Sequence, residues 1–192
     1  MSNSIFLNFL RHPTQVGAVC ASSRALSCAI TDMAELCHAP KTVVELGPGT
    51  GVFSREILQR QKVCGGRFLA LEINEDLCRN LWNTFPELEL YQENALRLPE
   101  LLAEKGIPHA DAVIAGLPWA IFPEQLQTDI LASVCRALRP GGFFLTFAYV
   151  QGVWLPAGQR FRRKLQEKFS TVETSPVIWR NLPPAFVYRC TL

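Results

Sequence analysis

The chain has 192 residues, 48% of them hydrophobic and 19% charged, and a formal net charge of +2. This length suits one domain with a sizeable core, and so small a net charge argues against a dedicated nucleic-acid binder. No apolar run is long enough to cross a bilayer, and the short apolar stretch 5–10 lacks the preceding basic residues of a secretory leader. We therefore expect a single domain over residues 1–192 of a cytoplasmic protein.

Cysteine usage supports the same compartment. The seven cysteines are an odd number, and none stands at a metal-ligand spacing from another cysteine or a histidine. Most of them interrupt apolar patterns. We expect buried free thiols in a reducing environment, and no metal site.

The first 31 residues contain no Asp or Glu. Residues 4–10 predict one or two apolar helical turns, and Ser22 or Ser23 can cap a helix that runs to about residue 37. We assign residues 1–38 to an N-terminal helical segment within the domain. It either packs on the core as a cap or lies in a membrane interface with its apolar residues Phe6, Phe9 and Leu10.

From residue 42 onward, strand and helix patterns alternate. We expect strands at 42–46, 67–72, 88–91, 111–116, 143–149, 171–179 and 185–191. We expect helices at 52–62, 74–85, 99–105, 123–138 and 158–168. The alternation predicts an α/β fold, a three-layer sandwich with a mostly parallel seven-stranded sheet plus the N-terminal helices.

A glycine-rich turn follows the first strand. Gly47, Gly49 and Gly51 lie directly behind the apolar run that ends at Glu45. Such a turn lets the backbone approach a ligand, and the next helix points its amide groups at the same spot. A dinucleotide site needs the spacing G-x-G-x-x-G, but Val52 occupies the position of the third glycine. The form E-L-G-x-G-x-G resembles the first motif of class I S-adenosylmethionine (SAM) methyltransferases; a ligand-free turn is the alternative.

In an open α/β sheet, ligands bind at the carboxyl ends of the strands. Glu72 ends the second strand, 25 residues after Gly47, where a carboxylate can accept both ribose hydroxyls. Asp111, by contrast, begins a strand and so belongs to the opposite edge. Resemblance to the class implies that Asn94 binds the adenine amino group and that the turn after the fourth strand faces the methyl donor. The expected SAM-binding set is Glu45, Gly47, Gly49, Gly51, Glu72, Asn94, Ala95, Gly116 and Leu117.

The turn Gly116-Leu117-Pro118-Trp119 resembles the N-P-P-[YF] turn of amino-methylating enzymes. Gly116 replaces the polar residue that would bind an aromatic amine, which weakens an adenine-methylating interpretation. We expect Trp119 to be exposed, where it either takes part in catalysis or pads the following helix. The candidate bases are Tyr149, His12 or a water that they hold, although His12 is more often expected as a solvated loop residue than as a base.

More selective segments resemble bacterial phospholipid N-methyltransferases. The run Val16-Gly17-Ala18-Val19-Cys20-Ala21-Ser22-Ser23-Arg24-Ala25-Leu26 is similar to their V-G-A-[IV]-x-P-S-S-x-x-L segment, with Ala21 in place of proline. Leu138-Arg139-Pro140-Gly141-Gly142, Phe147-Ala148-Tyr149 and Trp179-Arg180-Asn181-Leu182-Pro183-Pro184-Ala185 also resemble that family, so the similarity covers nearly the whole chain. Related rRNA adenine dimethyltransferases share the first motif but carry an additional helical domain.

The resemblance implies methyl transfer from SAM to the amine of phosphatidylethanolamine, toward phosphatidylcholine, by a peripheral enzyme on the inner face of the membrane. Aromatic rings would tolerate the growing methylammonium by cation–π attraction; the candidates are Phe122, Tyr149, Trp119, Trp154 and Trp179. The basic cluster within 160–168 is either solvated helix surface or a contact for an anionic membrane. The alternatives are methylation of a soluble amine, or SAM binding at a membrane surface without catalysis. The number of methyl groups transferred and the oligomeric state stay open.

Overall fold

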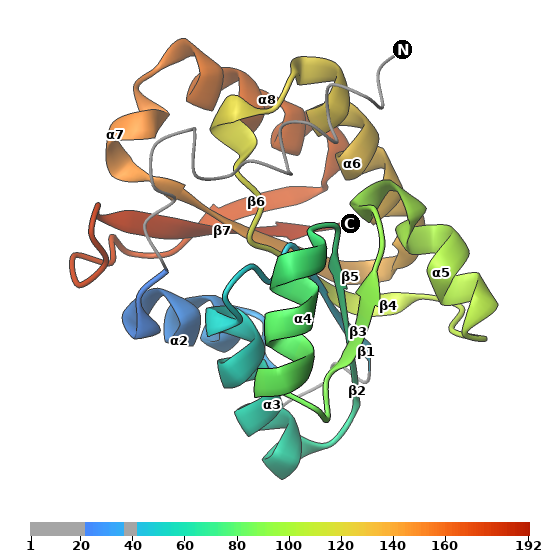
Figure 1. Ribbon diagram of the computed structural model, residues 1–192. Helices are drawn as coiled ribbons and strands as arrows, with labels where there is room; N and C mark the ends of the chain where they lie inside the picture. The colour runs from blue at the N-terminus through green and yellow to red at the C-terminus, as the bar shows by residue number, and fades with distance from the viewer. Residues whose placement is uncertain (1–21, 37–41) are drawn as a thin grey trace.

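The computed structural model describes residues 22–36 and 42–192 (Figure 1). The expected helical turns at 4–10, His12 and most of the segment 16–26 therefore lie outside the described residues. Within residues 22–36, helix α2 (Arg24–Met33) begins behind Ser23, as predicted. The Ser23 side chain accepts a hydrogen bond from the Leu26 amide at 3.2 Å, which satisfies one of the free donors of the first turn.

A seven-stranded sheet in the order β3-β2-β1-β4-β5-β7-β6 forms the centre of the molecule. Strands β1 to β5 are parallel, and β7 runs antiparallel to both of its neighbours, β5 and β6. This arrangement confirms the predicted α/β class and the mostly parallel sheet. The strands are β1 (Thr42–Leu46), β2 (Arg67–Glu72), β3 (Glu89–Gln92), β4 (Ala110–Ala115), β5 (Leu138–Tyr149), β6 (Thr171–Thr174) and β7 (Ala185–Thr191).

Helices cover both faces of the sheet, as Figure 1 shows. On one face α2, α3 (Val52–Cys64) and α4 (Glu75–Thr84) pack against apolar strand residues such as Phe68 and Ile114. On the other face α5 (Leu98–Glu104), α6 (Glu124–Ala137) and α8 (Pro156–Lys168) enclose a second core that includes Phe144. Two short 3-10 turns, η2 (Ala95–Arg97) and η3 (Trp119–Ile121), and the short helix α7 (Val150–Val153) complete the set.

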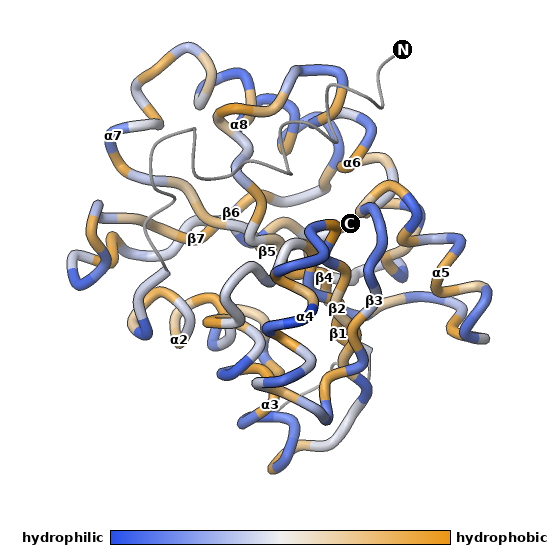
Figure 2. The backbone as a smooth tube through the Cα atoms, viewed as in Figure 1, coloured by the Kyte–Doolittle hydropathy of each residue, from blue (hydrophilic) through white to orange (hydrophobic). Residues whose placement is uncertain are grey.

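Burial follows from the sequence pattern of the strands. Four consecutive residues of β1 and five of β2 are buried, as expected for strands covered on both faces. Figure 2 shows the hydrophobic strands in the interior and hydrophilic residues along the outer helices such as α4. The central strands are buried along their length. Their polar residues can therefore contact solvent or a ligand only at the ends of the strands.

Two strands differ from their predicted bounds by more than one residue. Strand β5 begins at Leu138, before the Pro140-Gly141-Gly142 segment, because Leu138 already pairs with Ala110 ahead of a shift in register. Strand β6 ends at Thr174 and not near 179. The residues between β6 and β7 form a loop, closed by a single bridge between Ile178 and Ala185.

The two edges of the sheet carry different chemistry. At the amino edge, Asp111 accepts hydrogen bonds from the Thr42 amide at 2.9 Å and from Nε of Arg139 at 2.6 Å. Asp111 is therefore a structural ion-pair residue, remote from the carboxyl edge, as predicted. Because β6 is parallel to β5, the loop 175–184 lies at the carboxyl edge beside the end of β5.

Cys78 and Cys190 are buried free thiols as expected, whereas Cys28 and Cys135 are free thiols that are only partly buried. Cys64 at the end of α3 is disulfide-bonded, so the expectation of free thiols is wrong for this residue. Within residues 22–36 and 42–192, no helix combines the length and the hydropathy that a bilayer-spanning segment needs.

Candidate active site

The glycine turn joins β1 to α3 at the carboxyl edge. Gly49 and Gly51 have φ angles of +57° and +80°, a left-handed conformation that other residues adopt only at a cost. A Cβ atom at Gly51 would lie 2.5 Å from Cε2 of Phe85, so this glycine is needed for packing against α4. A Cβ at Gly49 would meet nothing within 4 Å, so its surroundings are open. Gly49 therefore marks the part of the turn at which a ligand has room.

The turn after β4 packs directly on the glycine turn. A Cβ on Gly116 would lie 2.8 Å from the carbonyl oxygen of Gly47, and a Cβ on Gly47 would lie 2.7 Å from Cδ2 of Leu117. The Gly116 amide also donates to the Leu46 carbonyl at 2.9 Å. Close backbone contact thus explains why glycine occupies position 116, where amino-methylating enzymes have a polar residue.

Glu72 ends β2 next to the glycine turn. Its Oε2 accepts a hydrogen bond from the Gly49 amide at 3.1 Å, and its Oε1 accepts from the amides of Ile73 and Asn74 at 2.9 and 3.0 Å. The side chain is nearly buried, and this burial raises its pKa, while the three amide donors act in the opposite direction. A carboxylate held in this way has lone pairs left for hydroxyl donors of a ligand.

Glu45 lies at the bottom of the same site. It is fully buried, and Oε2 accepts a hydrogen bond from Oγ of Ser54 at 2.6 Å, whereas Oε1 has no partner among residues 22–36 and 42–192. Burial raises the pKa of this carboxyl group to about 8; the Ser54 hydrogen bond lowers it, and the nearby Glu72 raises it further. The raised pKa keeps this carboxyl group protonated at neutral pH, and a ligand that brings a cationic N–H group next to Oε1 would favour its ionised form.

The expected adenine region follows β3. Asn94 is partly buried, and its Oδ1 accepts from the Leu96 amide at 2.9 Å, which caps η2. The Ala95 carbonyl accepts from Oγ of Ser133 on α6 at 3.1 Å. Asn94 and Ala95 are therefore held in fixed positions at the same edge as Glu72, and a second lone pair of Oδ1 is available for a donor.

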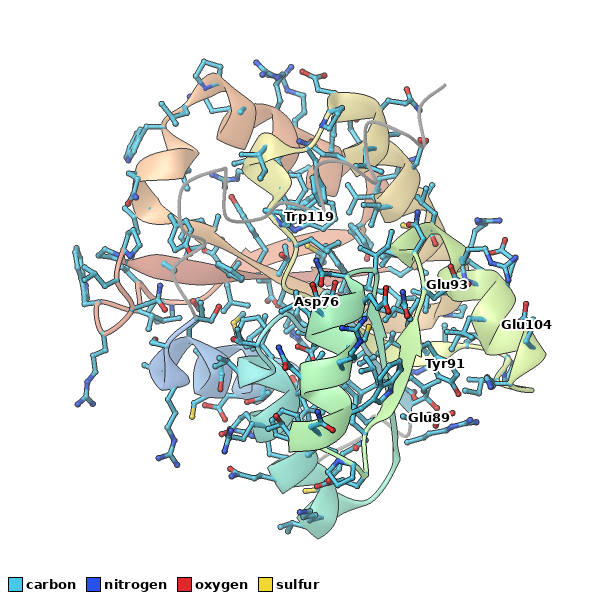
Figure 3. All side chains as sticks on the ribbon, in the orientation of Figure 1. Asp76, Glu89, Tyr91, Glu93, Glu104 and Trp119 are labelled. Atoms are coloured by element: carbon cyan, nitrogen blue, oxygen red, sulfur yellow. The ribbon has the colours of Figure 1, made fainter. Side chains whose placement is uncertain are left out.

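Trp119 corrects a prediction. Its side chain is only 5% exposed, its Nε1 donates to Oγ1 of Thr146 at 2.8 Å, and its ring stacks on Phe161 with centroids 4.8 Å apart. Figure 3 shows Trp119 among the side chains close to α8. The expectation of an exposed ring is wrong, because this indole belongs to the core under the turn. Trp119 packs in the core, with Thr146 and Phe161 as its partners.

The other proposed aromatic residues are also dispersed. Phe122 is buried beside Trp119, whereas Trp154 and Trp179 are largely exposed. Tyr149 is partly buried at the end of β5, and its ring contacts the edge of Phe147 with centroids 5.7 Å apart. Of the three predicted catalytic residues, Tyr149 alone combines partial burial with a place at the carboxyl edge within the described residues, since His12 lies outside them.

Comparison with known proteins decides the family. The family described as a methyltransferase domain matches residues 43–142. The ornithine lipid N-methyltransferase of Singulisphaera acidiphila is 32% identical over 186 residues, covering 95% of this chain and 91% of that protein. The chain belongs to the methyltransferase domain family.

Two further comparisons bear on this methyltransferase. Ribosomal RNA small subunit methyltransferase A of Thermosynechococcus vestitus is 34% identical over 120 residues, but the match covers 62% of this chain and only 41% of that protein. The crystal structure of N-methyltransferase NodS from Bradyrhizobium japonicum superposes with a TM-score of 0.65 at 11% identity, covering 86% of this chain and 93% of that one. The second likeness confirms the fold.

SAM is the cofactor of this class of methyltransferase, and the described residues fit it. The unpaired Oε1 of Glu45 suits the ammonium group, the open surroundings of Gly49 leave room beside the backbone, and Glu72 can accept from ribose hydroxyls. Asn94 and Ala95 lie at the position expected for the adenine.

Sequence reasoning missed three residues that support the methyltransferase site. Ser54 binds Glu45, Thr146 binds the Trp119 indole, and the amide nitrogen of Gln127 donates to the carbonyls of Trp119 and Phe122 at 2.8 and 3.1 Å. Ser54 and Gln127 are polar residues on the buried faces of α3 and α6. A polar residue that interrupts an apolar helix face could have identified both of them from the sequence.

Proposed function

We propose that this methyltransferase transfers methyl groups from SAM to the primary amine of a membrane lipid headgroup. The expected acceptor is phosphatidylethanolamine, with its methylated intermediates, toward phosphatidylcholine. The observation that carries the proposal is the similarity to an ornithine lipid N-methyltransferase over 95% of the chain. An ornithine lipid is therefore the second candidate acceptor, since its headgroup also presents a primary amine.

When bound, SAM supplies an electrophilic methyl group. The chain itself has to hold the acceptor in line and keep its amine neutral, because an ammonium has no lone pair with which to attack. A partly buried, apolar pocket favours the neutral amine. Tyr149, at the end of β5, is the described residue best placed to pass the released proton to water.

Support for a lipid acceptor also comes from the charge of the segments that follow β5 and β6. Residues 149–166 and 175–192 contain no Asp or Glu, so no carboxylate from these segments would repel a lipid phosphate. The partners that follow are a phospholipid substrate and an anionic membrane surface, with the protein peripheral on the inner face of the membrane.

Two alternatives make different predictions. A methyltransferase of a soluble amine would act without vesicles, and a SAM-binding protein without catalysis would transfer no methyl group. The test uses the purified chain, SAM labelled in its methyl group, and vesicles that contain phosphatidylethanolamine or ornithine lipid. Label in the extracted lipid supports the proposal, and the labelled species identifies the acceptor. Label only in added soluble amines, or in no product, would overturn it.

A further inference from the structure

Four large apolar side chains stand out into solvent at the carboxyl edge. Trp154 and Leu155, between α7 and α8, are 79% and 58% exposed, and Trp179 and Leu182, between β6 and β7, are 75% and 79% exposed. Side chains of this size are usually buried, so their exposure at one end of the sheet calls for a function. We call these four residues the aromatic rim.

The two loops of the rim are neighbours although they are distant in sequence. Tyr149 at the end of β5 pairs with Ala185 at the start of β7, and the next residue, Val150, donates its amide to the Pro184 carbonyl at 2.9 Å. Figure 1 shows α7 and the β6–β7 loop on the same side of the molecule. The rim therefore surrounds the end of β5, where Tyr149 lies.

Both loops are fixed from beneath. A Cβ on Gly158 would lie 2.2 Å from the Gly152 carbonyl oxygen, so α7 and α8 touch through their backbones. In the other loop Asn181 is buried; its Oδ1 accepts from the Ser23 amide at 2.9 Å and its Nδ2 donates to the Pro183 carbonyl at 2.7 Å. Gly152, Gly158 and Asn181 thus hold the two loops in place beneath their exposed apolar residues.

The charged side chains within the two segments that carry the rim have one sign. Residues 150–166 and 175–192 contain no acid. They include the exposed residues Arg162, Arg163 and Arg180, and none of the three is in a salt bridge among the described residues. Arg160 is excluded from this set because it pairs with Glu124 at 2.7 Å. Exposed tryptophan and leucine in the same segments as exposed arginine is a composition that binds the interface of an anionic bilayer.

We propose that the aromatic rim is the membrane-docking surface of this methyltransferase, with Trp154, Leu155, Trp179 and Leu182 inserted among lipid headgroups and Arg162, Arg163 and Arg180 against anionic lipid. This inference rests on the proposed lipid acceptor. Docking by the rim places the end of β5 against the bilayer, so that a headgroup amine reaches the site while its acyl chains stay in the membrane. A protein partner would match a continuous apolar surface, whereas this rim consists of two separate loop tips with arginines beside them.

The experiment compares the full chain, the double variant Trp154→Ala/Trp179→Ala and the control variant Trp82→Ala. Trp82 is 43% exposed near the end of α4, whose beginning lies at the carboxyl edge, so it is an exposed tryptophan distant from the rim. The probes are vesicles of phosphatidylcholine with or without phosphatidylglycerol, at low and high salt. We expect the full chain and Trp82→Ala to bind anionic vesicles with a blue shift of tryptophan emission. The double variant should bind about tenfold or more weakly.

Calorimetry with SAM checks that all three proteins keep the cofactor site. Methylation is measured on vesicles and on a short-chain phosphatidylethanolamine that stays monomeric in solution. The double variant should lose vesicle activity but keep activity on the monomeric lipid. The docking proposal would be overturned if the double variant bound vesicles as tightly as the full chain. It would also be overturned if the full chain formed dimers and the double variant did not, because the rim would then be a dimer interface. If the full chain docks through the rim but methylates neither lipid, docking stands and the proposed acceptor fails.

Discussion

Oε2 of Glu72 accepts a hydrogen bond from the Gly49 amide at 3.1 Å, which links the end of β2 to the glycine turn after β1. The acid therefore fixes the conformation of the turn and also faces the space that the turn leaves open. The Glu72 side chain therefore links cofactor binding to the backbone conformation of the glycine turn at residues 47–51.

Glu72→Gln tests this coupling. The variant loses the charge and can turn an amide N–H toward the Gly49 N–H, so we expect SAM affinity to fall by about 1.5–3 kcal/mol, or about 10- to 100-fold. Glu93→Gln is the matched control, because Glu93 follows the neighbouring strand β3 and its Oε1 accepts only from the Asn94 amide at 2.8 Å. Calorimetry that gives equal SAM affinities for both variants would contradict the assignment of Glu72.

The glycine turn offers two substitutions with different outcomes. Gly49→Ala adds a methyl group where nothing lies within 4 Å, so the fold should survive with a strain of about 1–2 kcal/mol while SAM binding is lost. Gly51→Ala places its Cβ 2.5 Å from the Phe85 ring and should destabilise the whole domain. Thermal unfolding with and without SAM distinguishes them: a folded Gly49→Ala protein that SAM still stabilises normally would show that the site lies elsewhere.

Glu45 predicts the pH dependence of stability in the absence of SAM. Burial raises the pKa of Glu45 in the folded protein to about 8, from an ordinary value of 4.5. The folded protein therefore keeps a proton that the unfolded chain releases, so the stabilising contribution is complete below pH 4.5 and is lost as the pH rises toward about 8. Glu45→Gln should reduce this slope in denaturant unfolding experiments across that range; an unchanged slope would exclude Glu45 as its source.

SAM binding should remove the proton that Glu45 keeps in the free protein. A cationic group next to the unpaired Oε1 favours the carboxylate, so binding at neutral pH should release a proton. Calorimetry in buffers of different ionisation enthalpy measures that release. The full chain should show it, and Glu45→Gln should show less.

Thr146→Val tests the positioning role of Trp119. The variant keeps the shape of the side chain but leaves the buried Trp119 N–H without an acceptor, at a cost of about 1–3 kcal/mol in the free energy of unfolding. Thr146→Ser should restore stability. If the indole only positions the turn after β4, methyl transfer should fall with Thr146→Val and recover with Thr146→Ser, while SAM affinity changes little.

The part of the site that could be predicted from sequence is the part that local patterns determine. The spacing of Gly47, Gly49 and Gly51 and the acid at Glu72 identify a strand–turn–helix site, because the backbone conformation there depends on the glycines themselves. The side on which Trp119 packs could not be predicted, since its partners Thr146 and Phe161 come from later elements. The predicted end of β6, near residue 179, lies beyond the observed end for a similar reason. The apolar residues near Ile178 favour a strand locally, but only a single bridge, to Ala185, forms there.

The reversed direction of β7 has a practical consequence. Leu192, the residue after β7, is bound at the amino edge of the sheet, where its amide donates to the Gly142 carbonyl at 3.1 Å and its carbonyl accepts from the Gly141 amide at 3.2 Å. A tether or fluorophore joined after Leu192 would therefore lie a full strand length away from Tyr149. Molecules attached to a sensor through that end would present the SAM site and the aromatic rim toward flowing vesicles, all in one orientation.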